Sequence, residues 1–181
     1  MQLLHQTISK LKGFKEWFDT LSLHESQLVL GLSGSVKHLA ESCAFEKSDK
    51  QLVIVTPTLL QAMQTYEELS EWYDDEVVHL FPVEESLAAD FSVVSPDVVS
   101  QRIRTLDFLS RGQKGIVIVP LSGIQKLLVP AAVWKKSSIE LAMGSEIESM
   151  DAFVEQLVEL GYRRENMVAT PGEFALRGSI V

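Results

Sequence analysis

The stretch QLVLGLSGSVKH, residues 27–38, decides the fold class that we expect for this chain. Residues 27–31 have the apolar composition of a short buried strand, and a helical pattern follows the glycine- and serine-rich loop through about Phe45. Strand, loop and helix in this order are typical of phosphate-binding loops of the form G-x-x-x-x-G-K-[ST]. Gly31 and Lys37 occupy the positions that this pattern requires, with Gly34 and Ser35 between them.

Two positions of this loop depart from a working phosphate site. Val36 stands where a glycine lets the backbone amides close around the phosphates, and its β-branched side chain would crowd them. His38 replaces the hydroxyl residue that holds Mg²⁺, and the predicted strands end in proline dipeptides without a metal-binding acid. We therefore interpret the loop as degenerate and expect no catalytic residue and no cofactor. Weak anion binding at the helix N-terminus and a glycine turn kept for packing remain alternatives.

Outward from the loop, apolar runs alternate with helical patterns. Three further strands are predicted at residues 51–55, 77–81 and 115–120, and helices at residues 3–20, from Thr58 to about Leu69, and from Pro96 to Gly112. Strands that are apolar on both faces and alternate with helices indicate a parallel sheet with helices on both faces. Residues 1–125 are thus predicted to form an α/β domain of an eroded P-loop or helicase-like type.

The pattern changes after Pro130. A strand is predicted at residues 139–143, then a helix capped by Ser149 and ended by Gly161, and then an alternating strand over residues 173–181. Residues 126–181 are interpreted as a small α+β domain. Because the sequence stops inside its last strand, we expect this domain to be truncated at the C-terminus and the parent protein to be longer.

Composition narrows the function classes. A net charge of −9 argues against a free-standing nucleic-acid binder, and a single cysteine, Cys43, is expected to lie in the core. Neither the cysteine nor the histidines have the spacing of a metal site. No apolar run of about 18 residues and no signal peptide is present, so we expect no membrane contact and a cytoplasmic location. The acids Glu84, Glu85 and Asp90 are interpreted as a solvated loop rather than an acid–base pair.

Several short motifs, taken together, indicate a family. They are FPVEE at 81–85, SPD at 95–97, QRI at 101–103, GIVIVP at 115–120 and GEFALRG at 172–178. In this order, with the eroded loop before them, they resemble the N-terminal UvrB-like region of bacterial transcription-repair coupling factors, the Mfd family. The resemblance covers about residues 25–181. UvrB itself carries a long aromatic hairpin, whereas the stretch 82–96 is short and has one aromatic residue, Phe91.

The resemblance implies a non-catalytic module that recruits UvrA to couple stalled transcription to nucleotide excision repair. RNA polymerase and DNA would be contacted by other domains of the parent protein, an ATP-dependent translocase. The implied UvrA-binding residues are Arg177, Arg163 and Arg164, and the alternating pattern places Arg177 on the solvent side of its strand. Ordinary solvated charges are the alternative for each arginine. The alternative function is a nucleotide-binding or helicase fragment with residual ATP or DNA affinity. A third possibility, an inhibitory clamp on the parent protein, is compatible with UvrA recruitment.

Overall fold

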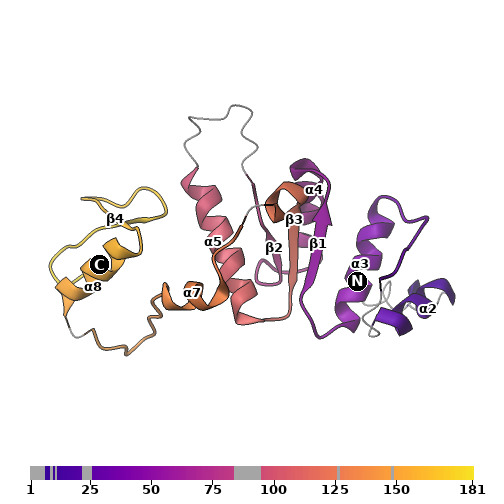
Figure 1. The fold of residues 1–181 in the computed structure, drawn as a ribbon, viewed down its shortest axis with the longest axis horizontal. Helices are drawn as coiled ribbons and strands as arrows, with labels where there is room; N and C mark the ends of the chain where they lie inside the picture. Colours follow the sequence, from indigo (N-terminus) through magenta and orange to yellow (C-terminus); the bar gives the residue numbers. More distant parts are fainter. Residues whose placement is uncertain are drawn as a thin grey trace. The chain divides into compact units, whose positions relative to one another are not determined.

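The computed structural model describes residues 7–8, 10, 12–21, 26–83, 95–125, 127–147 and 149–181 (Figure 1). Its helices are α2 (Lys12–Thr20), α3 (Ser35–Lys47), α4 (Leu59–Ser70), α5 (Pro96–Arg111), α6 (Leu121–Ile124), α7 (Ala131–Lys136) and α8 (Met150–Glu159). Its strands are β1 (Leu52–Thr56), β2 (Val78–Leu80), β3 (Ile116–Pro120), β4 (Arg163–Arg164) and β5 (Glu173–Phe174). The chain forms two compact units: the described parts of residues 1–83 with 111–125, and those of 84–110 with 126–181.

The first unit is built on a three-stranded parallel sheet in the order β1-β3-β2. Leu52 of β1 and Val78 of β2 both lie opposite Ile116, so β3 is the central strand. All five residues of β3 are buried, as its uninterrupted β-branched run predicts. The predicted strands 51–55, 77–81 and 115–120 and their parallel arrangement are thus confirmed to within a residue or two (Figure 1).

Helix α4 covers one face of this sheet and contacts all three of its strands. Ala62 and Leu69 on its inner face are fully buried, and they pack with Ile54, Ile116 and Ile118 of the sheet. The helix begins where the sequence predicts, because the Thr58 side chain accepts a hydrogen bond of 3.2 Å from the backbone amide of Gln61. This helix–sheet contact is the main core of the unit.

Helix α2 packs against α3 through a second, aromatic cluster in the first unit. Phe18 is buried against Cys43 and Ala44, and the Phe18 ring stacks on Trp17 with 4.9 Å between centroids. Burial also raises the pKa of the Cys43 thiol, which keeps it in the neutral form. Cys43 is therefore a core residue, as expected. The predicted helix 3–20 is described as α2 from Lys12, and much of its beginning lies outside the described residues.

One predicted strand of the first unit does not form. Residues 26–30 lie in no helix or strand, and Leu28 and Leu30 are 82% and 79% exposed. The prediction of a strand at 27–31 was wrong. An apolar composition shows that a segment could pack as a strand, but a strand forms only where a neighbouring strand pairs with it. In the sheet, β1 pairs with β3, and residues 26–30 are not added to it.

In the second unit, the ends of α8 follow the predicted signals. The Ser149 hydroxyl accepts a hydrogen bond of 3.4 Å from the amide of Ala152, and Gly161 follows the helix with φ at 91°. The helix contacts β4, which pairs with β5 in parallel. Among the described residues, no helix is long and apolar enough to cross a bilayer.

Two predictions for the second unit were wrong. Residues 139–143 form no strand, since Leu141 and Met143 are exposed rather than alternating into a core. The predicted strand 173–181 is limited to Glu173 and Phe174. It is followed by a tight turn in which Arg177 and Ile180 exchange backbone hydrogen bonds, because Gly178 adopts a φ of 64° that an extended strand excludes. The acids of the predicted loop 82–95 lie outside the described residues.

Candidate functional site

The segment that we predicted to be a degenerate phosphate loop is followed by the expected helix but is not preceded by the expected strand. Gly34 is the N-cap of α3, with φ at 57°, and Ser35 is the first helical residue. Gly31 also has a positive φ, 85°, so both glycines form the irregular turn that the motif predicts. The loop therefore ends at a helix N-terminus as expected, although the segment before it is not part of the sheet.

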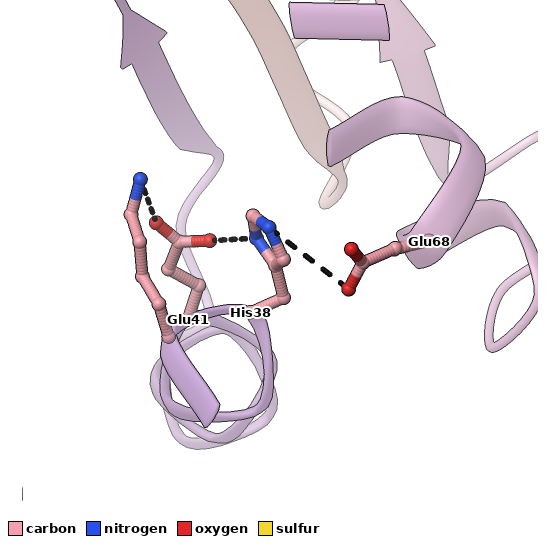
Figure 2. A network of polar contacts seen from close by, with 4 residues as sticks. His38, Glu41 and Glu68 are labelled. Carbon is pink, nitrogen blue, oxygen red and sulfur yellow. Dashed lines mark hydrogen bonds and ion pairs between the residues drawn. The ribbon is translucent and has the colours of Figure 1, made fainter. Parts of the chain in front are cut away.

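The polar side chains of α3 that follow this loop contact carboxylates (Figure 2). The Nδ1 atom of His38 donates to Oε2 of Glu41 over 2.9 Å, and Lys37 Nζ lies 3.7 Å from Oε1 of the same carboxylate. On its other side, His38 Nε2 lies 4.0 Å from Oε2 of Glu68 on α4. The imidazole thus sits between two acids, with its side chain only 11% exposed.

This network changes what the helix N-terminus can do chemically. Lys37, the cation that would neutralise a phosphate, forms an ion pair with Glu41. His38, in the position of the metal ligand, contacts the same carboxylate. The Glu41 carboxylate, which both side chains contact, opposes the binding of an anion by them. Within the described residues, no group of three or more histidine, cysteine or acidic side chains has the arrangement of a metal site. Two of these contacts lie within α3, and the 4.0 Å approach of His38 to Glu68 links α3 to α4.

The predicted arginines lie in the second unit. Two of them, Arg163 and Arg164, form β4, which pairs in parallel with β5. Arg163 lies opposite Glu173 and Arg164 opposite Phe174, with the Arg163 amide donating to the Gly172 carbonyl over 2.8 Å. Phe174, a member of this pair, is buried, whereas both arginines are exposed. A buried aromatic residue therefore anchors a short strand pair that carries two cationic side chains on its surface.

Glu173 is a residue of this surface that the sequence prediction missed. Its Oε2 atom accepts hydrogen bonds from the amides of Ala169, at 2.9 Å, and Thr170, at 3.1 Å, while Oε1 lies 3.3 Å from the Arg163 guanidinium. The two backbone hydrogen bonds, with the charge of Arg163, hold the pKa of the Glu173 carboxyl below its ordinary value. An acid directly after the Pro-Gly turn was the only signal in the sequence.

Arg177 lies beyond β5, and its side chain contacts the segment that connects β4 to β5. It is exposed, as predicted, and its guanidinium donates to the Asn166 carbonyl over 3.2 Å. Beside it is an open, mostly apolar cavity of about 380 Å³, whose lining includes Met167, Val168, Phe174, Arg177 and Ile180 together with the acid Glu173. Ile180 is 72% exposed because the chain turns at Gly178. The structure thus combines a cationic side chain with exposed apolar ones.

Comparison with known proteins places this surface in a recognised domain. Residues 139–181 match the UvrB interaction domain family. Over 96% of its length the chain is 40% identical to the transcription-repair-coupling factor of Staphylococcus epidermidis, of which it covers 15%. It is 37% identical over 99% of its length to that of Staphylococcus haemolyticus, again covering 15% of the relative. It is 40% identical over 85% of its length to that of Staphylococcus aureus, covering 13% of it.

These similarities confirm the resemblance that the motifs indicated, to the N-terminal region of transcription-repair coupling factors of the Mfd family. The chain spans about 15% of the length of the first curated relatives it matches.

Proposed function

We propose, from this similarity to transcription-repair coupling factors, that the chain is their UvrB-like N-terminal module and that it recruits UvrA to stalled transcription. One observation carries the proposal. The segment that matches the UvrB interaction domain, residues 139–181, is also the segment that presents Arg163, Arg164 and Arg177 at its surface. A surface with guanidinium groups beside exposed apolar side chains suits a protein partner that offers carboxylates.

We assign the two parts of the chain different roles. Residues 1–125 form a UvrB-like, helicase-type α/β domain descended from a P-loop fold, and the parallel sheet and the helix after Gly34 support this assignment. Residues 126–181 form the UvrA-binding-type α+β domain. The match over 139–181 lies entirely within this second domain.

The first domain is proposed to have no ATPase activity. Val36 stands in place of the loop glycine and is half exposed at the start of α3, where phosphates would approach. Lys37 and His38 both contact Glu41, so the side chains nearest to the ancestral phosphate site are engaged by an acid of the same helix. ATP-driven translocation, and contacts with RNA polymerase and DNA, are assigned to other domains of the parent protein.

Arg177 is proposed as the main UvrA contact, with Arg163 as the second and Arg164 as a minor one. Arg177 uses its guanidinium once, toward the Asn166 carbonyl, and adjoins the exposed side chains of Met167 and Ile180. A guanidinium has five N–H donors in a planar fork, so it can still pair with a partner carboxylate in a bidentate manner. Interface arginines bordered by apolar contacts are frequent hot spots.

The test is an Arg177→Ala substitution in the full-length protein, titrated with UvrA by calorimetry. Loss of an interface hot spot of about 2 kcal/mol weakens binding about thirtyfold. Arg177→Lys should recover only part of the affinity, since an ammonium cannot form the bidentate pair. The matched control is Arg104→Ala, which removes an exposed arginine from α5. Unchanged affinity for Arg177→Ala, or an equal loss for Arg104→Ala, would refute the assignment, provided that thermal unfolding shows both variants folded.

A further inference from the structure

The connection between β4 and β5 is unusually short for parallel strands. It consists of residues 165–172, whereas parallel neighbours are commonly joined by a crossover of about a dozen residues or more. The backbone must therefore reverse direction within this loop, and amides in such a reversal have no strand partner. An acceptor close by can bind such amides and hold the short connection in one conformation.

Glu173 provides that acceptor from the first position of β5. One oxygen of its carboxylate binds the amides of Ala169 and Thr170, at 2.9 and 3.1 Å. The other oxygen lies 3.3 Å from the guanidinium of Arg163, the residue directly opposite on β4. A single carboxylate thus closes the C-terminal half of the loop and fixes an arginine of the neighbouring strand.

The other half of the loop is held by Arg177, whose guanidinium donates to the Asn166 carbonyl over 3.2 Å. Asn166 and Ala169 belong to the same short connection, so the two arginines are linked through one loop. A displacement of the loop at Ala169 would also move the Asn166 carbonyl, which accepts the hydrogen bond from Arg177.

We propose that Glu173 is a positioning residue of the UvrA-docking surface. It holds the loop 165–172 closed and orients the Arg163 guanidinium, so that Arg163 and Arg177 face the same acidic partner together. The inference rests on the proposed function, because the consequence of this positioning is measured on UvrA binding. Glu173 itself makes no contact with the partner.

The exposure of the two side chains shows that Glu173 does not compete with a partner carboxylate for Arg163. The Glu173 side chain is 11% exposed, whereas that of Arg163 is 67% exposed. The carboxylate is covered and engaged by backbone amides, and the guanidinium faces solvent with donors to spare. A partner carboxylate can therefore approach Arg163 without displacing Glu173.

The experiment uses Glu173→Gln in the full-length protein, titrated with UvrA by calorimetry. Glutamine keeps the size of the side chain and one acceptor oxygen but loses the charge that Arg163 and the two amides share. We expect UvrA affinity to fall about tenfold, the effect of losing one charge-assisted contact. The matched control is Glu165→Gln, which removes an exposed charge from the same loop and should leave the affinity unchanged.

Two further measurements separate positioning from a general loss of structure. Hydrogen exchange of the Ala169 and Thr170 amides should rise in Glu173→Gln and stay unchanged in Glu165→Gln. In a double-mutant cycle, Arg163→Ala should cost less affinity in the Glu173→Gln background than in the wild type, since the two residues act as one unit. A merely destabilised domain would give additive losses, and that result would overturn the inference.

The outcomes also distinguish this inference from the proposed function. If Arg163→Ala and Arg177→Ala weaken UvrA binding while Glu173→Gln leaves it unchanged or tightens it, the positioning role is refuted and the docking function stands. If amide exchange rises in Glu173→Gln but neither that variant nor the arginine variants change UvrA affinity, the docking function is refuted.

Discussion

The chain uses the pairing of a glutamate with basic side chains in two places, with opposite degrees of exposure. In α3, His38 lies between Glu41 and Glu68 with its side chain almost covered (Figure 2). At the β4–β5 pair, Glu173 is covered while the guanidinium of Arg163 is largely exposed. In the first site the imidazole is the most covered group, with Glu41 19% and Glu68 40% exposed, whereas in the second site the acid is the covered group.

This difference indicates what each site contributes. A covered imidazole whose ring nitrogens both face acids has little surface left for a ligand, so its contacts stabilise α3 and the packing of α3 against α4. An exposed guanidinium gains little stability from its ion pair, because solvent screens it. The same exposure leaves donors for a partner. The contacts after Gly34 therefore contribute to the stability of the first unit, and the arginine surface is the part that we propose for recognition.

The largest effect that tests this contrast is expected for His38→Ala. The hydrogen bond between His38 and the Glu41 carboxylate is covered and charge-assisted, and its loss should lower the free energy of unfolding by about 2 kcal/mol. The measurement is denaturant unfolding of the chain, with Glu67→Gln as a control that removes an exposed charge of α4. UvrA affinity below the unfolding transition should not change. A stable His38→Ala variant with weakened UvrA binding would reverse the roles assigned to the two sites.

The parts of the fold that could be predicted from sequence are those that local chemistry determines. Three features are recognisable from the residues themselves and are confirmed: the apolar strand Ile116–Pro120, the helix cap at Thr58 and the helix end at Gly161. The strands expected at 27–31 and 139–143 failed because a strand also needs a neighbour, which composition does not specify.

The same distinction applies to the candidate site. Arg177 is exposed, as predicted, although the alternating strand on which that prediction rested ends at Phe174. The function of Glu173 could not be predicted, because its contacts with Ala169 and Arg163 depend on a loop that folds back on itself. Likewise, the pairing of His38 with Glu68 joins two helices whose packing becomes visible only in three dimensions.

A smaller effect is expected for Arg164→Ala. Successive residues of a strand point to opposite faces, so Arg164 and the neighbouring Arg163 cannot both face one partner surface. An exposed charge at the edge of an interface contributes a few tenths of a kcal/mol, and the change in UvrA affinity should stay below about threefold. Calorimetry beside Arg163→Ala measures the difference. A loss for Arg164→Ala that equals or exceeds that for Arg163→Ala would show that the other face of the strand pair contacts UvrA.

The smallest effect, no change at all, is expected when Mg-ATP is added to the chain. A ligand that binds only the folded state raises the unfolding midpoint by mass action, about 2.7 kcal/mol of stability at a hundredfold excess over its dissociation constant. Because Lys37 and His38 are engaged by Glu41, the turn at Gly34 offers little to a triphosphate, and thermal unfolding should be unaffected. Glu41→Gln frees both side chains and serves as the sharper probe. If the wild type shows a clear upward shift of its midpoint, the loop still binds nucleotide; if only Glu41→Gln shows one, the acid is what blocks the ancestral site.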